Sequence, residues 1–145
     1  MTSVENQDQA EKRIPTLIHV PAVIRGLSVE PLLGPVDLTP WLNHVQWVIV
    51  GGESGRDARP MHPYWVCDIR DQCLAAGVAF FFKQWGEWAP ITLGTESHPE
   101  LWNDAKSWRS RMQRLGKKAA GRIFDGRTWN ALPPIDLAEN AMNNH

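Results

Sequence analysis

The chain has 145 residues with a formal net charge of −1, and 43% of its residues are hydrophobic. A chain of this length holds one domain with a core of its own. No apolar run is long enough to cross a bilayer and the N-terminus has no apolar signal core, which excludes a membrane-spanning chain and predicts a cytoplasmic protein.

The N-terminal part of the chain predicts little regular structure. Residues 1–12 are polar and lack periodicity, so we expect them to be disordered. A short helix is expected from about residue 12 to residue 19, and Pro21 would end it. Apolar and polar residues then alternate over residues 26–30, which predicts a strand that ends at Glu30.

The stretch that follows is the centre of the predicted fold. Residues 46–50 are mostly apolar and β-branched, as in a strand buried on both faces of a parallel sheet. Glycine lets a ligand approach the backbone closely, and α/β folds bind ligands at the carboxyl ends of their strands. The turn after this strand is therefore a predicted site, with an ordinary strand-to-helix turn as the alternative; it consists of Gly51, Gly52, Glu53, Ser54 and Gly55.

A βαβ unit is predicted around this turn. Pro63 suits the first position of a helix, apolar residues recur at helical spacing up to Ala76, and Gly77 ends the helix. Residues 78–83 predict a second buried strand. Because the connection between the two strands should be right-handed, the strands are expected to be parallel, with their carboxyl ends at one edge.

Charged side chains of both signs are expected at that edge, namely Glu30, Glu53 and Lys83. Opposite charges support each other's ionised forms. The set suits a zwitterion, whose amino group the carboxylates bind while Lys83 or the N–H groups of the glycine turn bind its carboxylate, or it suits acid–base chemistry. An ion-pair network without a ligand is the alternative. The predicted ligand-binding residues are Glu30, Gly51, Gly52, Glu53, Ser54, Lys83, Gln84 and Trp85.

The residues alone predict no metal site. The histidines are scattered without metal-ligand spacing, and the glycine turn is neither a Walker loop nor a dinucleotide fingerprint. Cys67 and Cys73 lie six residues apart on the predicted helix, a rotation of roughly 600°. They are expected to face different directions, so we interpret them as buried free thiols.

The C-terminal part of the chain is basic. Residues 105–127 are rich in Lys and Arg and contain one acid, Asp125. A basic segment on an acidic body predicts contact with a polyanion such as nucleic acid, and a solvated face is the alternative. The predicted nucleic-acid-binding residues are Lys117, Lys118 and Arg122, with Trp129 for stacking on bases. We expect residues 91–133 to form a Trp-rich, basic extension and residues 134–145 to form a flexible tail.

Several long motifs resemble those of a known family. They are Ser28-Val29-Glu30-Pro31-Leu32-Leu33-Gly34-Pro35, Trp47-Val48-Ile49-Val50-Gly51-Gly52-Glu53-Ser54-Gly55, Ala58-Arg59-Pro60-Met61, Phe80-Phe81-Phe82-Lys83-Gln84-Trp85-Gly86-Glu87-Trp88, Gly116-Lys117-Lys118-Ala119-Ala120-Gly121-Arg122 and Asp125-Gly126-Arg127-Thr128-Trp129. Over residues 14–133 the chain is similar to the phage gene product thirty-seven/sixty-eight family, a phage and prophage domain of unknown function that looks like radical SAM proteins.

This resemblance implies an α/β fold: a partial parallel (β/α) barrel over residues 13–90, formed by the last three strands of a radical-SAM-like barrel, with the basic extension after it. Full-length relatives look like proteins that hold a [4Fe–4S] cluster and SAM through an N-terminal three-cysteine motif. The chain contains two cysteines in all, and neither matches that motif. It is therefore expected to be a C-terminal half of unknown reaction without a cofactor of its own.

Two further functions stay open. The chain is a nucleic-acid-binding module that uses its basic segment, or an enzyme completed in trans by an N-terminal half that carries the cysteine motif. An isolated half-barrel should expose an apolar patch near residues 26–30, where the preceding strands would pair, and should therefore self-associate.

Overall fold

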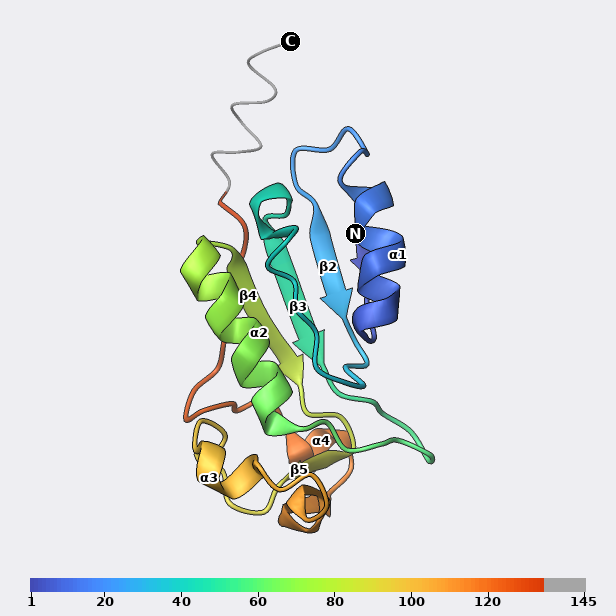
Figure 1. Cartoon of the computed structure of the whole chain (residues 1–145). Coiled ribbons are helices and arrows are strands. Elements are labelled where there is room, and N and C mark those ends of the chain that lie inside the picture. Colours follow the sequence, from blue (N-terminus) through green and yellow to red (C-terminus); the bar gives the residue numbers. More distant parts are fainter. Residues whose placement is uncertain (135–145) are drawn as a thin grey trace.

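A four-stranded parallel sheet is the centre of the structure, a computed structural model that describes residues 1–134 (Figure 1). The strands lie side by side in chain order, β1 (Thr2–Ser3), β2 (Gly26–Val29), β3 (Trp47–Gly51) and β4 (Ala79–Gln84). All three neighbouring pairs are parallel. The predicted α/β class with a parallel sheet is confirmed, and closure into a barrel stays a prediction.

Two helices cover one face of this sheet. Helix α1 (Gln7–Leu17) connects β1 to β2, and α2 (Pro63–Ala76) connects β3 to β4, so both run in front of the sheet in Figure 1. The residues that point toward the helices are fully or almost fully buried and lie in two rows across the sheet: Leu27, Val48 and Phe80, then Val29, Val50 and Phe82. This face and the apolar sides of both helices form one core.

The opposite face of the sheet has no helix over it within residues 1–134. Its row of Ser28, Ile49 and Phe81 is half-buried. Strands that follow one another in order, with their helices on one face, are the arrangement of a (β/α) barrel segment. No helix in the described part of the chain is long and apolar enough to span a membrane.

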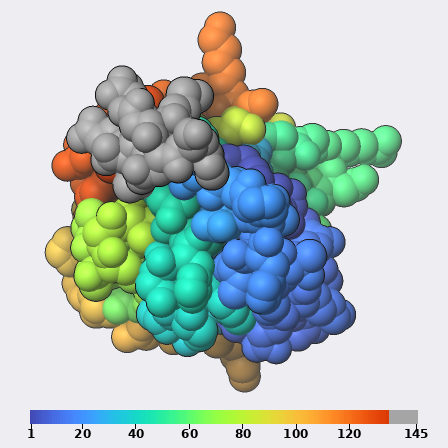
Figure 2. Space-filling view, turned by 90° about the horizontal axis from the view of Figure 1, so that it is seen from above, coloured from blue at the N-terminus to red at the C-terminus, as the bar shows by residue number. Residues whose placement is uncertain are grey.

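The N-terminal residues are ordered, and the prediction of disorder over residues 1–12 is wrong. Strand β1 pairs with β2, and Val4 donates its N–H to the carbonyl of Ser28 at 2.9 Å. The side chain of Asn6 caps α1 by accepting from the N–H of Gln9 at 3.0 Å. In Figure 2 this segment, drawn in blue, forms one continuous surface with its neighbours. Its apolar residues Val4 and Ala10 are fully buried, although the overall polarity of the segment suggested a solvated chain.

This N-terminal segment also changes the expected edge of the sheet. Because β1 occupies the outer side of β2, the predicted apolar patch near residues 26–30 is absent, and Leu27 and Val29 are fully buried. Self-association of the chain stays a prediction, and the burial of this strand does not support it. The first edge of the sheet within the described residues is instead β1, two residues long.

The C-terminal segment packs against β4 and the carboxyl end of the sheet. It contains an antiparallel pair, β5 (Trp88–Pro90) with β6 (Met112–Arg114), and the short helices α3 (Pro99–Trp102) and α4 (Lys117–Ala120). A 3-10 turn, Trp108–Arg111, leads directly into β6. The predicted tail, residues 134–145, lies outside the described residues except for Pro134.

Two aromatic residues of this segment extend the core. The rings of Phe124 and Phe82 are 5.1 Å apart, and those of Trp129 and Phe80 are 5.8 Å apart. Phe82 also donates its N–H to the carbonyl of Trp129 at 2.9 Å. The extension therefore covers the outer edge of β4, and it is part of the domain's core.

Candidate functional site

Polar side chains meet at the carboxyl ends of β2, β3 and β4. The Nζ atom of Lys83 lies 3.1 Å from Oε2 of Glu30. The amide of Gln84 donates to Oε1 of Glu30 and to Oγ of Ser54, each at 3.4 Å. The structure therefore brings together four predicted site residues. The Lys83 side chain is 51% exposed, so the ion pair contributes little to stability and leaves the ammonium accessible.

Glu53 does not join this group, although the sequence predicted that it would. Its carboxylate binds Arg59 in a bidentate ion pair, with Nε at 2.9 Å and Nη2 at 3.0 Å. Arg59 holds the pKa of Glu53 below its ordinary value. This ion pair joins two residues of the same turn, six positions apart in the chain. The alternating pattern of the strands could not predict it. The predicted pair of carboxylates for the amino group of a zwitterion is thus not formed.

The glycines of the turn serve close packing of the backbone. A Cβ atom on Gly52 would lie 1.8 Å from the carbonyl oxygen of Trp85. The N–H of Gly52 donates to the carbonyl of Gln84 at 3.0 Å, and that of Gly55 donates to Oε1 of Glu87 at 3.2 Å. These two N–H groups are occupied by the protein, so the predicted role of the turn in holding a ligand carboxylate is not supported. Gly51 faces Glu30: a Cβ atom added to Gly51 would lie 3.0 Å from the carboxyl carbon of Glu30.

Trp85 is a core residue, in contrast to its predicted place in the ligand site. Its side chain is 1% exposed, and its indole N–H donates to the carbonyl of Ile123 at 2.7 Å. The ring packs against Phe82 and Phe124. The register between β3 and β4 shifts beside Gly51, because Val50 pairs with Phe82 and Gly51 pairs with Gln84. This extra residue in β4 turns Trp85 toward the core, which the chain order alone could not predict.

A cavity of about 370 Å³ opens beside the exposed edge residues. The predicted strand-end residues Lys83 and Gln84 line it together with the predicted cations Lys117, Lys118 and Arg122. Gly121, which was not predicted, completes the lining. The N–H of Trp85 donates to the carbonyl of Gly121 at 3.0 Å, which fixes the basic segment against the end of β4. Figure 1 shows α4 beyond the arrowhead of β4. We call this space the edge cavity.

The edge cavity is positively charged. Within residues 1–134, no carboxylate lies in ion-pair distance of Lys117, Lys118 or Arg122. The guanidinium of Arg122 lies over the ring of Phe81, 5.2 Å from its centroid, and donates to Oδ1 of Asn130. One carboxylate, Glu30, balances Lys83. Such an excess of cations around a concave surface attracts anions.

Trp129 is not open to a nucleic-acid base, which corrects its predicted role. The guanidinium of Arg127 lies 3.9 Å and that of Arg70 lies 5.3 Å from its ring centroid. The indole N–H donates to the carbonyl of Phe124 at 2.8 Å. Arginine already occupies the ring surface that a base would need.

The two cysteines are buried thiols on α2, as predicted. Burial raises the pKa of Cys67 to about 11 and that of Cys73 to about 12. The thiol of Cys67 donates to the carbonyl of Glu96 at 3.3 Å. Both thiols are therefore protonated at neutral pH, whereas metal ligands are thiolates.

One buried acid escaped the sequence analysis. Glu96 has no exposed surface, and neither carboxylate oxygen has a hydrogen-bond partner of ordinary geometry within the described residues. Burial raises its pKa, the carboxylate of Asp125 raises it further, and nearby backbone N–H groups lower it. A single Glu in a polar loop carries no sequence signal for such burial.

Comparison with known proteins gives a family and no function. No curated protein and no solved structure matches the chain. A model of a family described as "protein of unknown function (DUF5131)" matches residues 1–133. The match includes the sheet, both of its helices and the edge cavity. The chain therefore belongs to the DUF5131 family of proteins of unknown function.

Proposed function

We propose that the chain binds a phosphate-bearing ligand in the edge cavity, at the carboxyl edge of a radical-SAM-like partial barrel. The observation that carries the proposal is the convergence of Lys117, Lys118 and Arg122, without carboxylate partners in the described residues, on the strand-end residues Lys83 and Gln84. Ligands of (β/α) proteins bind at this edge of the sheet. A single carboxylate, Glu30, lies beside these cations.

A phosphate group fits this set of donors better than a zwitterion does. Lysine ammonium groups and an arginine guanidinium supply donors and charge for phosphate oxygens. The amino group of a zwitterion would need a carboxylate, but Glu30 is paired with Lys83 and Glu53 is paired with Arg59. The cavity volume of about 370 Å³ lies within the range of small-molecule sites.

Removing charge from the edge cavity should weaken anion binding. We expect the double variant Lys117→Gln, Lys118→Gln to bind inorganic pyrophosphate at least about tenfold more weakly than the unchanged chain, because each lysine supplies a charged hydrogen bond. The logarithm of the association constant should also fall with the logarithm of salt concentration, and the slope should become shallower in the variant. Titration calorimetry at two salt concentrations measures both quantities.

The matched control is Lys12→Gln with Lys106→Gln, which removes two exposed lysines away from the edge cavity and leaves the net charge equal to that of the test variant. This control should bind pyrophosphate as the unchanged chain does. Equal weakening in both double variants would assign the effect to overall charge, and a salt-independent affinity would exclude phosphate recognition.

Single-stranded nucleic acid is a second candidate ligand for the same cations. The observation that favours it is the exposed guanidinium of Arg122 in the edge cavity, a planar cation that can bind a phosphate and stack on a base. This candidate no longer includes Trp129. A short oligothymidylate should then bind more tightly than pyrophosphate at equal salt, with a steeper salt dependence. Equal affinity for both would favour a small phosphate-bearing molecule.

The third candidate function is an enzyme completed in trans by an N-terminal half, and the parallel sheet is compatible with it. In this hypothesis the N-terminal half supplies the cysteine motif. We expect anaerobic iron and sulfide reconstitution of the isolated chain to give no [4Fe–4S] absorption, because Cys67 and Cys73 are buried thiols of raised pKa. Absorption in the sulfur-to-iron charge-transfer region and iron content measure this. A stoichiometric cluster on this chain would refute the interpretation of both cysteines.

A further inference from the structure

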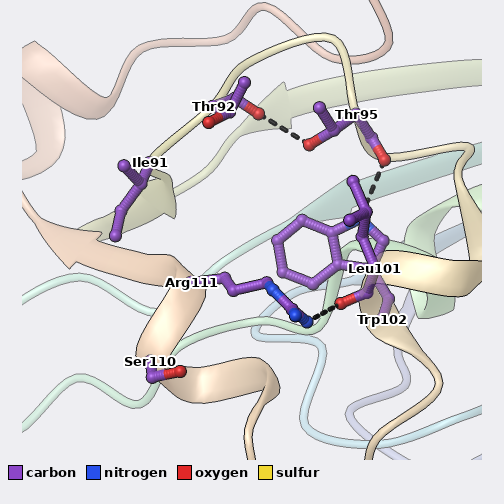
Figure 3. Close-up of a pocket in the computed structure, with 7 residues that line it drawn as sticks. All are labelled: Ile91, Thr92, Thr95, Leu101, Trp102, Ser110 and Arg111. Atoms are coloured by element: carbon purple, nitrogen blue, oxygen red, sulfur yellow. Dashed lines mark hydrogen bonds between the residues drawn. The ribbon is translucent and has the colours of Figure 1, made fainter.

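A second cavity, of about 270 Å³, lies in the extension and shares no residue with the edge cavity (Figure 3). It is enclosed by the turn after β5, by α3 and by the 3-10 turn before β6. Its lining combines apolar and polar side chains, namely Ile91, Thr92, Thr95, Leu101, Trp102 and Arg111, with Ser110 at its edge. We call it the Arg111 cavity.

Hydrogen bonds within the lining hold the Arg111 cavity in shape. The hydroxyl of Thr95 donates to the carbonyl of Thr92 at 2.7 Å, and the indole N–H of Trp102 donates to the carbonyl of Thr95 at 2.8 Å (Figure 3). The N–H of Ile91 donates to the carbonyl of Arg111 at 2.8 Å. The walls are therefore preorganised, which lowers the entropic cost of ligand binding.

The walls of this cavity are largely apolar. Trp102 is 3% exposed and forms a fixed aromatic surface, while Ile91 is 55% exposed at the mouth. Leu93, in the same turn, is 53% exposed. Exposed aliphatic residues beside a preformed concavity are the surface that an apolar group covers on binding.

Arg111 gives the cavity its single charge. The guanidinium extends across the space toward Leu101 and Trp102 and donates one hydrogen bond to the carbonyl of Leu101 (Figure 3). No carboxylate of residues 1–134 lies in ion-pair distance of it. A guanidinium presents five N–H donors that match a carboxylate. Backbone hydrogen bonding lowers the pKa of Asp104 and the charge of Arg111 contributes to this shift, but that carboxylate forms no ion pair with Arg111, so the guanidinium can still bind a second carboxylate.

We infer that the Arg111 cavity binds a carboxylate that carries a short branched apolar group. The guanidinium would take the carboxylate, and Trp102, Leu101 and Ile91 would take the aliphatic body. A peptide C-terminus that ends in leucine and a free branched-chain acid share this chemistry. The volume of about 270 Å³ admits a fragment of that size.

The test compares an acid with its amide in one NMR titration. N-acetyl-L-leucine mimics a peptide C-terminus, 4-methylpentanoate is a free branched acid, and N-acetyl-L-leucinamide has the same apolar body without the charge. We expect both acids to shift the indole N–H signal of Trp102 saturably at millimolar concentration, and the amide to bind at least tenfold more weakly. Tighter binding of N-acetyl-L-leucine identifies the peptide source, and tighter binding of 4-methylpentanoate identifies the free acid.

Variants separate the charge from the apolar wall. Arg111→Gln should weaken both acids about tenfold, whereas Arg109→Gln, an exposed neighbour whose guanidinium lies over Trp108, should leave them unchanged. Ile91→Trp should block the mouth of the cavity and prevent binding. Because Ile91 is exposed, this substitution should leave the packing of the core unchanged. Equal binding of acid and amide, no saturable shift, or full affinity in Arg111→Gln would overturn the inference. Pyrophosphate affinity in Arg111→Gln is a separate readout that reports the edge cavity alone.

Discussion

Replacement of Gly52 by alanine is expected to destabilise the protein by more than about 3 kcal/mol, or to prevent folding. The added Cβ would lie 1.8 Å from the carbonyl oxygen and 2.6 Å from the carbonyl carbon of Trp85. Both atoms belong to the backbone, so no rotamer change relieves the clash. The end of β4 would have to move away from β3, and the hydrogen bond from Gly52 to the carbonyl of Gln84 would be lost.

Chemical denaturation followed by circular dichroism measures this effect, with Gly34→Ala as its control. A Cβ at Gly34 has no atom within 4 Å, and its φ lies outside the left-handed region. This control should change the free energy of unfolding by no more than about 0.5 kcal/mol. Similar unfolding midpoints for the two variants would contradict the close approach of the two strand ends.

Replacement of Glu96 by glutamine is expected to stabilise the protein at neutral pH by about 1–3 kcal/mol. The carboxyl group has no exposed surface and no hydrogen bond of ordinary geometry within the described residues, and burial, which outweighs the nearby backbone N–H groups, is the main cause of its raised pKa. At neutral pH the folded protein must then either bury the charged carboxylate or keep it protonated well above its ordinary pKa, and both cost free energy. Glutamine has a similar shape and carries no charge, which removes this cost.

The pH dependence of this effect follows from the direction of the pKa shift. The folded state of the unchanged chain binds the proton of Glu96 more tightly than the unfolded state, so Glu96 costs no stability below the ordinary value of 4.5. As pH rises from there through the raised pKa of the folded state, stability falls by up to about 1.4 kcal/mol per pH unit. Other groups that shape this site are Cys67, Arg70 and Asp125.

Unfolding curves between pH 4 and pH 8 for the unchanged chain and Glu96→Gln test this dependence. The two stabilities should converge at the acidic end and diverge as pH rises. Glu100→Gln serves as the control, because this carboxylate is fully exposed and its pKa is lowered, so it should give no such divergence. Parallel stability profiles for the unchanged chain and Glu96→Gln would show that Glu96 is not buried.

The strongest local patterns predicted the central part of the fold. The apolar strands at residues 46–50 and 78–83 and the helix between Pro63 and Gly77 all form at almost the expected positions. Hydrophobic spacing, a proline at the start and a glycine at the end act within a few residues. These signals can be recognised in a single sequence because each depends only on residues that are close in the chain.

The N-terminal segment shows what local patterns miss. Strand β1 is two residues long, and α1 buries three small or aliphatic residues, Ala10, Ile14 and Leu17, among polar ones. Their burial depends on pairing with β2 and packing on the core, which are contacts distant in sequence. Hydrophobic density alone therefore assigned residues 1–12 to disorder and began the helix at about residue 12 instead of at Gln7.

The candidate site was predicted in part. The meeting of Glu30 and Lys83 follows from parallel strands whose carboxyl ends lie at one edge of the sheet, and the structure has this pair across the end of β3. The partnership of Glu53 with Arg59 and the packing of Lys117, Lys118 and Arg122 beside Lys83 depend on how loops fold back on the sheet. Loop positions are fixed by contacts between residues distant in sequence, such as the hydrogen bond from the N–H of Trp85 to the carbonyl of Gly121, which no periodicity reveals.

The edge cavity is tested most directly by mapping amide signals in a titration with inorganic pyrophosphate. The proposal predicts saturable shifts concentrated on the side-chain amide of Gln84 and on the backbone of Gly121 and Arg122, with residues of α1 unchanged. The Lys117→Gln, Lys118→Gln variant should lose these shifts at the same pyrophosphate concentration. Shifts spread over the whole surface, or saturable shifts away from the edge cavity, would contradict the proposed phosphate-binding site.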